Sequence, residues 1–214
     1  MSLKAIIFDF DGLIMDTETP WYYAFRDIYQ EHGVELSLSL WSRNVGTNFD
    51  EFNPFHYLEE ALQKPIDHDH IKELSEQKYA VYVGEAGLLP GVAELLASVK
   101  QRKLLLAVAS SSTRDWVHSY LKKLGIFEAF DVIHTSEDVQ RVKPDPELYE
   151  LTLARLGIDA SEAIVFEDSP NGLKAAKAAG IRCIIVPNEV TRDLEFLNFD
   201  QRLASIAEFD LEAL

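Results

Sequence analysis

Two carboxylates follow an apolar run near the start of the chain. Residues 5–8 are Ala, Ile, Ile and Phe, and Asp9, Phe10, Asp11 and Gly12 come next. Ligands of open parallel sheets bind beyond the carboxyl ends of the strands, so acids at this position are well placed for chemistry. Alternation along a strand puts Asp9 and Asp11 on the same side, about 6–7 Å apart. An ordinary strand-to-loop turn explains this single motif equally well.

A serine-rich segment follows a second apolar run, residues 104–109. Ser110 and Ser111 stand at the end of this run, and the backbone amides after them open a helix, an arrangement that binds anions. The competing interpretation is that Ser112 or Thr113 only caps that helix. This strand end is therefore suited either to hold an anion or to start a helix.

A lysine and two further acids complete the set of polar residues. Two prolines restrict the backbone beside Lys143, so its side chain is held more firmly than that of an ordinary loop lysine. A solvated surface lysine is the competing interpretation. Glu167 and Asp168 follow the apolar run 163–166. Helix capping explains one of these two acids but does not easily explain both.

Considered together, these strand ends predict one site for a cation and a phosphate. Three or four carboxylates are ligands that a hard cation such as Mg²⁺ prefers. A serine, backbone amides and a lysine favour a phosphate group beside the cation. We therefore expect Mg²⁺ as the cofactor and a phosphate group bound beside it.

Four motifs carry a resemblance to a known family. They are Asp9-Phe10-Asp11-Gly12, Ser110, Lys143-Pro144 and Glu167-Asp168. In order and spacing they resemble the four motifs of the haloacid dehalogenase superfamily, and the resemblance covers essentially the whole chain. A helical block after the first strand resembles the cap of the beta-phosphoglucomutase-like branch.

The resemblance implies a role for each catalytic residue. Asp9 is expected to attack phosphorus and to become the aspartyl phosphate. Asp11 would protonate the leaving alkoxide and then deprotonate the hydrolytic water. Ser110 and the Ser111 amide would hold a phosphoryl oxygen. Lys143 would offset negative charge on Asp9 and on the phosphoryl group.

The same resemblance implies a set of magnesium ligands. They would be the Asp9 carboxylate, the Asp11 backbone carbonyl and the Asp168 carboxylate. Glu167 would be a further ligand, directly or through water. Metal and lysine together would supply most of the electrostatic stabilisation that phosphoryl transfer requires.

The elements that must position these residues alternate along the chain. Buried parallel strands are expected at the apolar runs 5–8, 104–109, 132–133, 163–166 and 181–186. From residue 90 onward, helices with one apolar face fall between these runs. We therefore predict an α/β fold, a doubly wound parallel sheet with a Rossmann-like core.

The segment 16–86 interrupts this alternation. It contains no clear strand, and helices are expected at about 21–32, 48–63 and 70–83. We therefore divide the chain into a Rossmann-like catalytic core, residues 1–15 and 87–214, and an inserted all-helical cap, residues 16–86. A block on two connectors is expected to close over the site as a lid.

Four residues of the cap are candidates for contact with the substrate. Glu18 lies at the first hinge, Trp21 follows it, and Thr47 and Asn48 lie in a loop that faces the site in this branch. For Trp21 the alternative is a place in the cap core, because it lies on an apolar helical face. Phe49 stands where mutases of this branch carry an arginine.

These residues favour one function over another. We expect a magnesium-dependent phosphatase, a phosphoric monoester hydrolase, acting on a small phosphorylated metabolite such as a sugar phosphate. The alternative is a sugar-phosphate phosphomutase of the beta-phosphoglucomutase type. A mutase must grip the phosphate that does not react, and an aromatic ring at position 49 cannot give the bidentate contact of an arginine.

The composition bears on partners and location. The 214 residues carry a formal net charge of −16, which repels the phosphates of nucleic acids and an anionic membrane surface. The chain shows no signal peptide and no apolar stretch approaching about 20 residues. We expect a cytoplasmic protein with no nucleic-acid or membrane partner, and the sequence predicts no particular oligomer.

Overall fold

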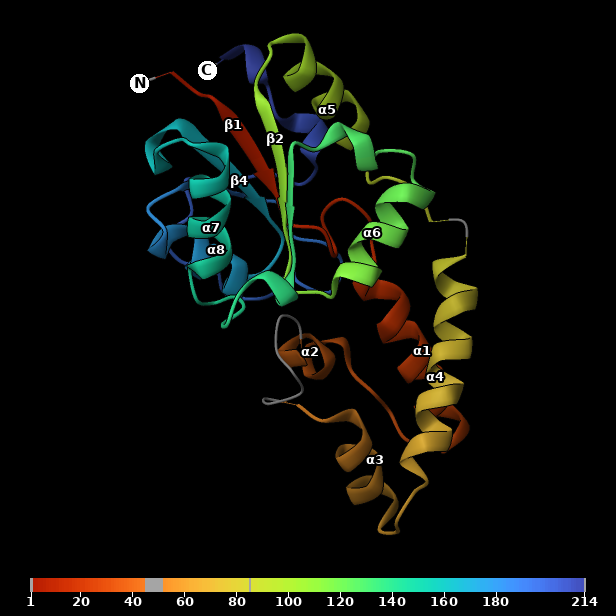
Figure 1. Ribbon diagram of the computed structural model, residues 1–214. Helices are drawn as coiled ribbons and strands as arrows, with labels where there is room; N and C mark the ends of the chain where they lie inside the picture. Colours follow the sequence, from red (N-terminus) through yellow and green to blue (C-terminus); the bar gives the residue numbers. More distant parts are fainter. Residues whose placement is uncertain (1, 45–51, 85, 214) are drawn as a thin grey trace.

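A six-stranded parallel sheet forms the centre of the molecule. The computed structural model describes residues 2–44, 52–84 and 86–213 (Figure 1). The strand order is β3-β2-β1-β4-β5-β6, and every neighbouring pair is parallel. The strands are β1 (Ala5–Phe8), β2 (Leu105–Ala109), β3 (Val132–His134), β4 (Ala163–Glu167), β5 (Arg182–Ile185) and β6 (Gln201–Arg202). The predicted doubly wound fold is confirmed.

Alternation along the strands builds two apolar cores, one on each face of the sheet. Ile6 and Phe8 of β1 pack with α5 (Val92–Gln101) and α6 (Arg114–Lys123). Ile7, between them in sequence, faces the opposite core with α7 (Glu147–Leu156) and α8 (Pro170–Ala178). Because helices cover both faces, the central strands are apolar, as the sequence predicts, except for Glu167 at the carboxyl end of β4.

The sequence prediction missed the last strand. β6 has only two residues, Gln201 and Arg202, and these pair with Ile184 and Ile185 of β5. One of the two β6 residues is exposed and neither is apolar, so no buried run marks the strand. The five predicted strands all form, with ends that differ from prediction by no more than one residue.

The regular elements described between β1 and α5 are all helices, joined by turns and loops. It contains α1 (Glu18–Glu31), α2 (Leu38–Trp41), α3 (Pro54–Leu62) and α4 (His68–Val83). These helices lie beyond the carboxyl ends of the strands (Figure 1), and α1 and α4 pack against each other. We call residues 16–86 the helical insertion. Within the described ranges, no helix combines the length and the apolar character needed to cross a membrane.

The helices of the insertion differ from prediction at their starts. α3 begins at Pro54 because the Asn53 side chain accepts hydrogen bonds from the first free backbone amides. Residues 48–51 of the predicted helix lie outside the described ranges. α4 begins two residues earlier than predicted, where Asp67 caps its first turn.

The two connectors of the insertion meet beside the sheet. The backbone amide of Leu89, on the returning segment, donates to the carbonyl of Ile14 on the outgoing segment (2.9 Å). Gly12 and Met15 close a tight turn just before the outgoing segment, again through the backbone (2.9 Å). The insertion therefore joins the core at one place, next to the end of β1.

Candidate active site

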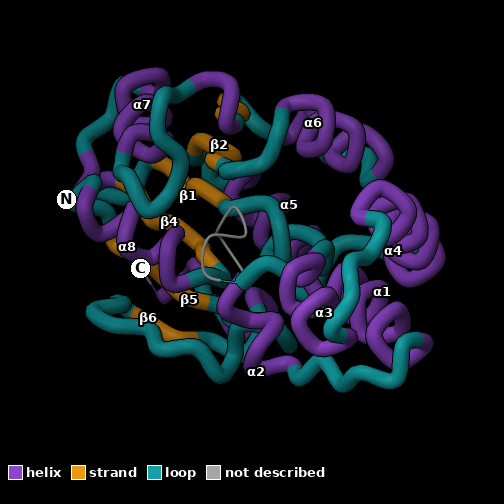
Figure 2. Tube along the Cα trace, turned by 90° about the horizontal axis from the view of Figure 1, so that it is seen from below, coloured by secondary structure: helices purple, strands orange, loops and turns teal. Residues whose placement is uncertain are grey.

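Neighbouring strands bring the predicted catalytic residues to one edge of the sheet. Asp9 follows β1, Ser110 follows β2, and Glu167 ends β4, directly before Asp168. Since β2, β1 and β4 are adjacent, their carboxyl ends meet, and Figure 2 views these strands side by side from this end. The structure thus gathers residues that are up to 159 positions apart in the sequence.

Lys143 joins two of the acids in a buried ion pair network. Its Nζ lies 2.5 Å from Asp9 Oδ1 and 2.7 Å from Glu167 Oε1. Asp9 and Lys143 are each 7 % exposed, and Glu167 is 0 % exposed. The prediction of a fixed lysine rather than a solvated one is supported, because a buried ammonium requires such partners.

Both oxygens of Glu167 accept hydrogen bonds from the protein. Oε1 accepts from Lys143 Nζ and from the Tyr149 hydroxyl (2.6 Å). Oε2 accepts from the backbone amides of Asp168 (3.2 Å) and Ser169 (3.4 Å) and from the Ser169 hydroxyl (3.2 Å). Glu167 is therefore held under the first turn of α8, where free amides favour a carboxylate.

Asp9, Glu167 and Asp168 form an acidic cluster that fits a divalent cation. One carboxylate oxygen from each lies within 4.8 Å of the others. Oxygen ligands of this kind suit Mg²⁺. If all three acids are ionised, Lys143 neutralises one of the three negative charges. The remaining two negative charges match the two positive charges of a divalent cation.

Burial makes these carboxylates costly to ionise without a cation. It raises the pKa of Asp9 to about 7, against the opposing effect of the Lys143 charge. The pKa of Asp168 is raised well above its ordinary value by burial and by the nearby charge of Asp9. A cation within the cluster would favour the ionised forms, so the residues present fit a metal site.

Asp11 lies apart from this cluster and accepts hydrogen bonds from four side chains. Oδ1 accepts from the Thr17 hydroxyl (2.9 Å) and the Trp116 indole (2.8 Å). Oδ2 accepts from the hydroxyls of Ser112 (2.6 Å) and Ser110 (3.3 Å). Thr17 directly precedes α1 and Trp116 lies on α6, so both the insertion and the core hold this carboxylate.

The serine segment after β2 does not cap α6 through the Thr113 side chain, and it contacts Asp11 instead. Thr113 is the residue before α6, but its side chain makes no capping hydrogen bond. Ser112 donates to Asp11, and its amide donates to Ser110 Oγ (3.0 Å). The Ser111 hydroxyl is buried and has no hydrogen-bond partner among the described residues. An unpaired buried hydroxyl here is suited to an incoming anion.

The candidate cap residues differ in their placement. Glu18 opens α1, and burial, followed by the charges of Asp11, Asp16 and Asp9, raises its pKa to about 8. Trp21 stacks on Tyr79 of α4 with ring centres 4.1 Å apart. This contact fits the alternative of a packing role. The other two candidates, Thr47 and Asn48, lie outside the described residues.

Besides Ser112 and Ser169, four side chains of the described residues contact this site and were not among the predicted site residues: Thr17, Trp116, Tyr149 and Asn188. Asn188 donates from Nδ2 to Asp168 Oδ2 (2.7 Å). It stands three residues beyond β5, so the rule used for the other strand ends could have found it. The other three give no such signal, because their contacts depend on how distant elements pack.

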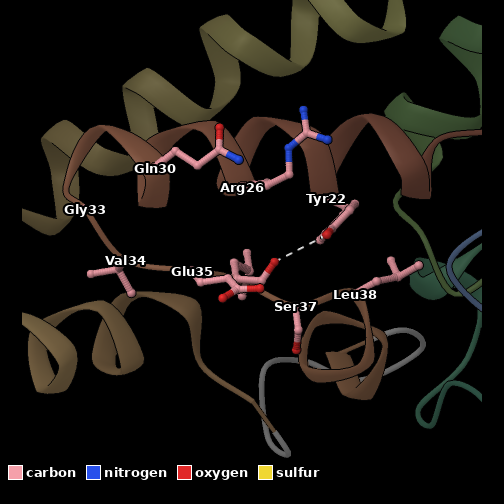
Figure 3. Close-up of a pocket in the computed structure, with 9 residues that line it drawn as sticks. Tyr22, Arg26, Gln30, Gly33, Val34, Glu35, Ser37 and Leu38 are labelled. Carbon is pink, nitrogen blue, oxygen red and sulfur yellow. Dashed lines mark hydrogen bonds between the residues drawn. The ribbon is translucent and has the colours of Figure 1, made fainter.

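A separate pocket lies within the helical insertion (Figure 3). It has a volume of about 580 Å³ and lies between α1 and residues 33–38. Tyr22 spans it, donating its hydroxyl to the Leu36 carbonyl (3.3 Å). None of the predicted site residues within the described ranges lines this pocket, and its lining includes no residue of the acidic cluster.

Gly172 offers a test of how tightly Glu167 is held. A Cβ added at Gly172 would lie 1.8 Å from Glu167 Oε1, so either the carboxylate or α8 must move. We expect Gly172→Ala to lower the stability by about 1–3 kcal/mol, as overpacking does, and to lower hydrolytic activity. Thermal melting and phosphate release measure the two effects.

Gly87→Ala is the control, because no described residue lies within 4 Å of an added Cβ there. We expect that variant to match the parent protein in both measurements. A Gly172→Ala protein that is as stable and as active as the Gly87→Ala protein would contradict the close packing of Glu167.

Comparison with known proteins identifies the family. Residues 6–186 match the model of the haloacid dehalogenase-like hydrolases. Because this match spans most of the 214 residues, the chain belongs to that family. The resemblance stated from the four motifs is confirmed, and the chain is a hydrolase of this family.

Two relatives carry phosphatase names. YhcW of Bacillus subtilis (strain 168), with a provisional phosphatase name, is 46% identical over 212 residues, which cover 99% of this chain and 96% of YhcW. The phosphorylated carbohydrates phosphatase of Thermotoga maritima is 37% identical over 183 residues, 85% of this chain and 84% of that protein. They support the assignment of this hydrolase as a phosphatase.

A solved structure agrees with this relationship. CbbY from Rhodobacter sphaeroides in complex with phosphate has a TM-score of 0.74 and 32% identity, and the match covers 96% of both chains. A mutant of the same protein in complex with xylulose-(1,5)bisphosphate has a TM-score of 0.70 and 31% identity over the same shares. Both have the fold described above.

Proposed function

We propose that this protein is a magnesium-dependent phosphatase of small phosphorylated carbohydrates and that it acts through an aspartyl phosphate on Asp9. The observation that carries the proposal is the buried ion pair of Asp9 and Lys143 beside Glu167 and Asp168. The relatives named above support the phosphatase class and the carbohydrate substrates.

Asp9 is the nucleophile in this proposal. Its carboxylate attacks phosphorus, the bond to the leaving oxygen breaks, and the phosphoryl group becomes attached to Asp9. Lys143 Nζ, 2.5 Å from Asp9 Oδ1, favours the ionised form of the acid and offsets the charge of the arriving phosphate. Ser110 and the Ser111 amide hold a phosphoryl oxygen, and the unpaired Ser111 hydroxyl offers a further donor.

Asp11 moves the protons. In the first half-reaction it gives a proton to the leaving alkoxide, and in the second it takes one from the water that attacks the aspartyl phosphate. Its two oxygens already accept four hydrogen bonds, so at least one donor must yield when Asp11 is protonated. The Ser110 contact is the longest, at 3.3 Å.

The proposed magnesium ligands are the Asp9 and Asp168 carboxylates and the Asp11 backbone carbonyl. Glu167 is the further ligand, directly or through water, although its oxygens also accept from Lys143, Tyr149 and the start of α8. When bound, the metal offsets the negative charge that gathers during phosphoryl transfer.

The helical insertion is the proposed lid. We divide the chain at residues 16–86, where two connectors leave and return beside the site. Glu18, on the first turn of α1, is the described cap residue that we propose to contact the substrate hydroxyls. With its pKa raised to about 8, its carboxyl is largely protonated at pH 7 and is able to donate a hydrogen bond.

Phosphate release from a panel of sugar phosphates and an aryl phosphate tests the function. We expect turnover with Mg²⁺, loss of turnover in excess chelator, and recovery when Mg²⁺ is restored. Calcium should substitute poorly, because its looser coordination does not hold the nucleophile in line. Full activity in chelator would contradict the metal site, and no turnover of any phosphate ester would contradict the function.

A second measurement separates a phosphatase from a phosphomutase. We expect beta-glucose 1-phosphate, supplied with a trace of the 1,6-bisphosphate, to yield free phosphate faster than glucose 6-phosphate. The reason is that Phe49 and Asp50 offer no cationic grip for a second phosphate. Both residues lie outside the described ranges. Glucose 6-phosphate formed faster than free phosphate would favour the mutase.

A further inference from the structure

Asn188 holds two parts of the proposed metal site at once. Its Nδ2 donates to Asp168 Oδ2 (2.7 Å) and to the backbone carbonyl of Gly12 (3.2 Å). Gly12 follows Asp11 in the turn after β1, whereas Asp168 follows β4. An amide nitrogen has two hydrogens, so these two bonds use its full donor capacity.

The orientation of the Asn188 amide is fixed by its oxygen. Oδ1 accepts from the backbone amides of Val190 (2.9 Å) and Thr191 (3.1 Å), which only an oxygen can do. The backbone amide of Asn188 donates in return to the Thr191 hydroxyl (3.0 Å), and Thr191 is fully buried. Asn188 is therefore rigid, with its donor side toward the acids.

The same turn, residues 188–191, contacts the helical insertion. Glu189 Oε1 accepts a hydrogen bond from the Tyr23 hydroxyl of α1 (3.1 Å). Val190 is 2 % exposed and belongs to the apolar core of the insertion rather than to either core of the sheet. The backbone that carries Asn188 is thus anchored on both sides.

We propose that Asn188 is a positioning residue for the metal site, which orients the Asp168 carboxylate and the turn at Gly12 for a divalent cation. The inference rests on the proposed function. Asp168 has two oxygens, and a donor bound to Oδ2 leaves Oδ1 free and fixes the plane of the carboxylate. Partners that orient metal ligands in this way typically contribute about 10–100-fold to metal affinity.

Two variants separate this role from a merely structural one. Asn188→Ala removes both the donor to Asp168 and the acceptor that shapes the turn. Asn188→Asp keeps the acceptor for Val190 and Thr191 but cannot donate to Asp168. If only the shape of the turn matters, the Asn188→Asp protein keeps the Mn²⁺ affinity that the Asn188→Ala protein loses.

The measurement is calorimetric titration of Mn²⁺ into the full chain without substrate, beside thermal melting of each protein. We expect both variants to bind Mn²⁺ about 10-fold or more weakly than the parent protein. Asn198→Asp is the matched control, because it makes the same asparagine-to-aspartate substitution at an exposed residue. We expect this control to bind like the parent protein.

Three outcomes decide the matter. Weaker binding in both variants, with an unchanged control, supports the proposal. An Asn188→Asp protein that binds as well as the parent overturns the positioning role alone, and the phosphatase proposal stands. A parent protein that binds no Mn²⁺ overturns both.

Discussion

The Asp9→Asn variant is expected to release no phosphate and to form no phosphoenzyme. An amide cannot attack phosphorus to give a stable acyl phosphate, so the reaction loses its covalent step. We expect the hydrolytic rate to fall by at least about 10⁴-fold, the scale seen when a nucleophile is removed. Steady-state phosphate release, together with mass spectrometry after a pulse of aryl phosphate, measures both effects.

The structure indicates that this variant folds. Asparagine keeps an oxygen able to accept from Lys143, and Lys143 keeps its second partner, Glu167, at 2.7 Å. Asp16→Asn is a matched control, because Asp16 Oδ1 accepts from the backbone amide of Thr19 in the first turn of α1 (3.0 Å) and asparagine keeps that acceptor. Phosphate found on the Asp9→Asn protein would show that another residue is the nucleophile.

The Asp11→Asn variant is expected to fail at a different step. An aryl phosphate has a good leaving group that needs little protonation, so it should still transfer its phosphoryl group to Asp9. Hydrolysis of that intermediate then lacks its general base and should slow by about 10²–10⁴-fold. A phosphorylated protein should therefore accumulate and be visible by mass spectrometry, whereas an alkyl phosphate should react slowly from the start.

The contacts of Asp11 make this substitution a mild one for the fold. The Trp116 indole cannot accept a hydrogen bond, so an asparagine would keep its oxygen toward Trp116 and Thr17. Its new amide group would face Ser110 and Ser112, whose hydroxyls are able to turn and accept. Absence of any accumulated phosphoenzyme, with hydrolysis at the parent rate, would remove Asp11 from the mechanism.

The sequence alone predicted the fold and the meeting of the strand ends. Both follow from local features: continuous apolar runs between amphipathic helices, and polar residues directly after those runs. Asp9, Lys143 and Glu167 were predicted for one site, and in the structure Lys143 contacts both acids. The pattern of residues alone did not assign different roles to Glu167 and Asp168, because both follow the same apolar run, residues 163–166.

What the sequence did not predict depends on the packing of distant elements. Trp116 reaches Asp11 across 105 positions, and nothing in its neighbourhood distinguishes it from a core tryptophan. Tyr149 belongs to the apolar core on one face of the sheet, and only the folded structure brings its hydroxyl to Glu167. Trp21 was given a substrate role and, as its alternative, a packing role, and its ring stacks on Tyr79.

Val190 links the helical insertion to the rest of the chain. The insertion of a relative could be exchanged into this chain as one segment, residues 16–86. Yet Val190 lies outside residues 16–86 and still fills the apolar centre of the insertion. The insertion of a relative would therefore pack against Val190, whose shape fits the present apolar core. A functional chimaera should exchange residues 188–191 together with the insertion.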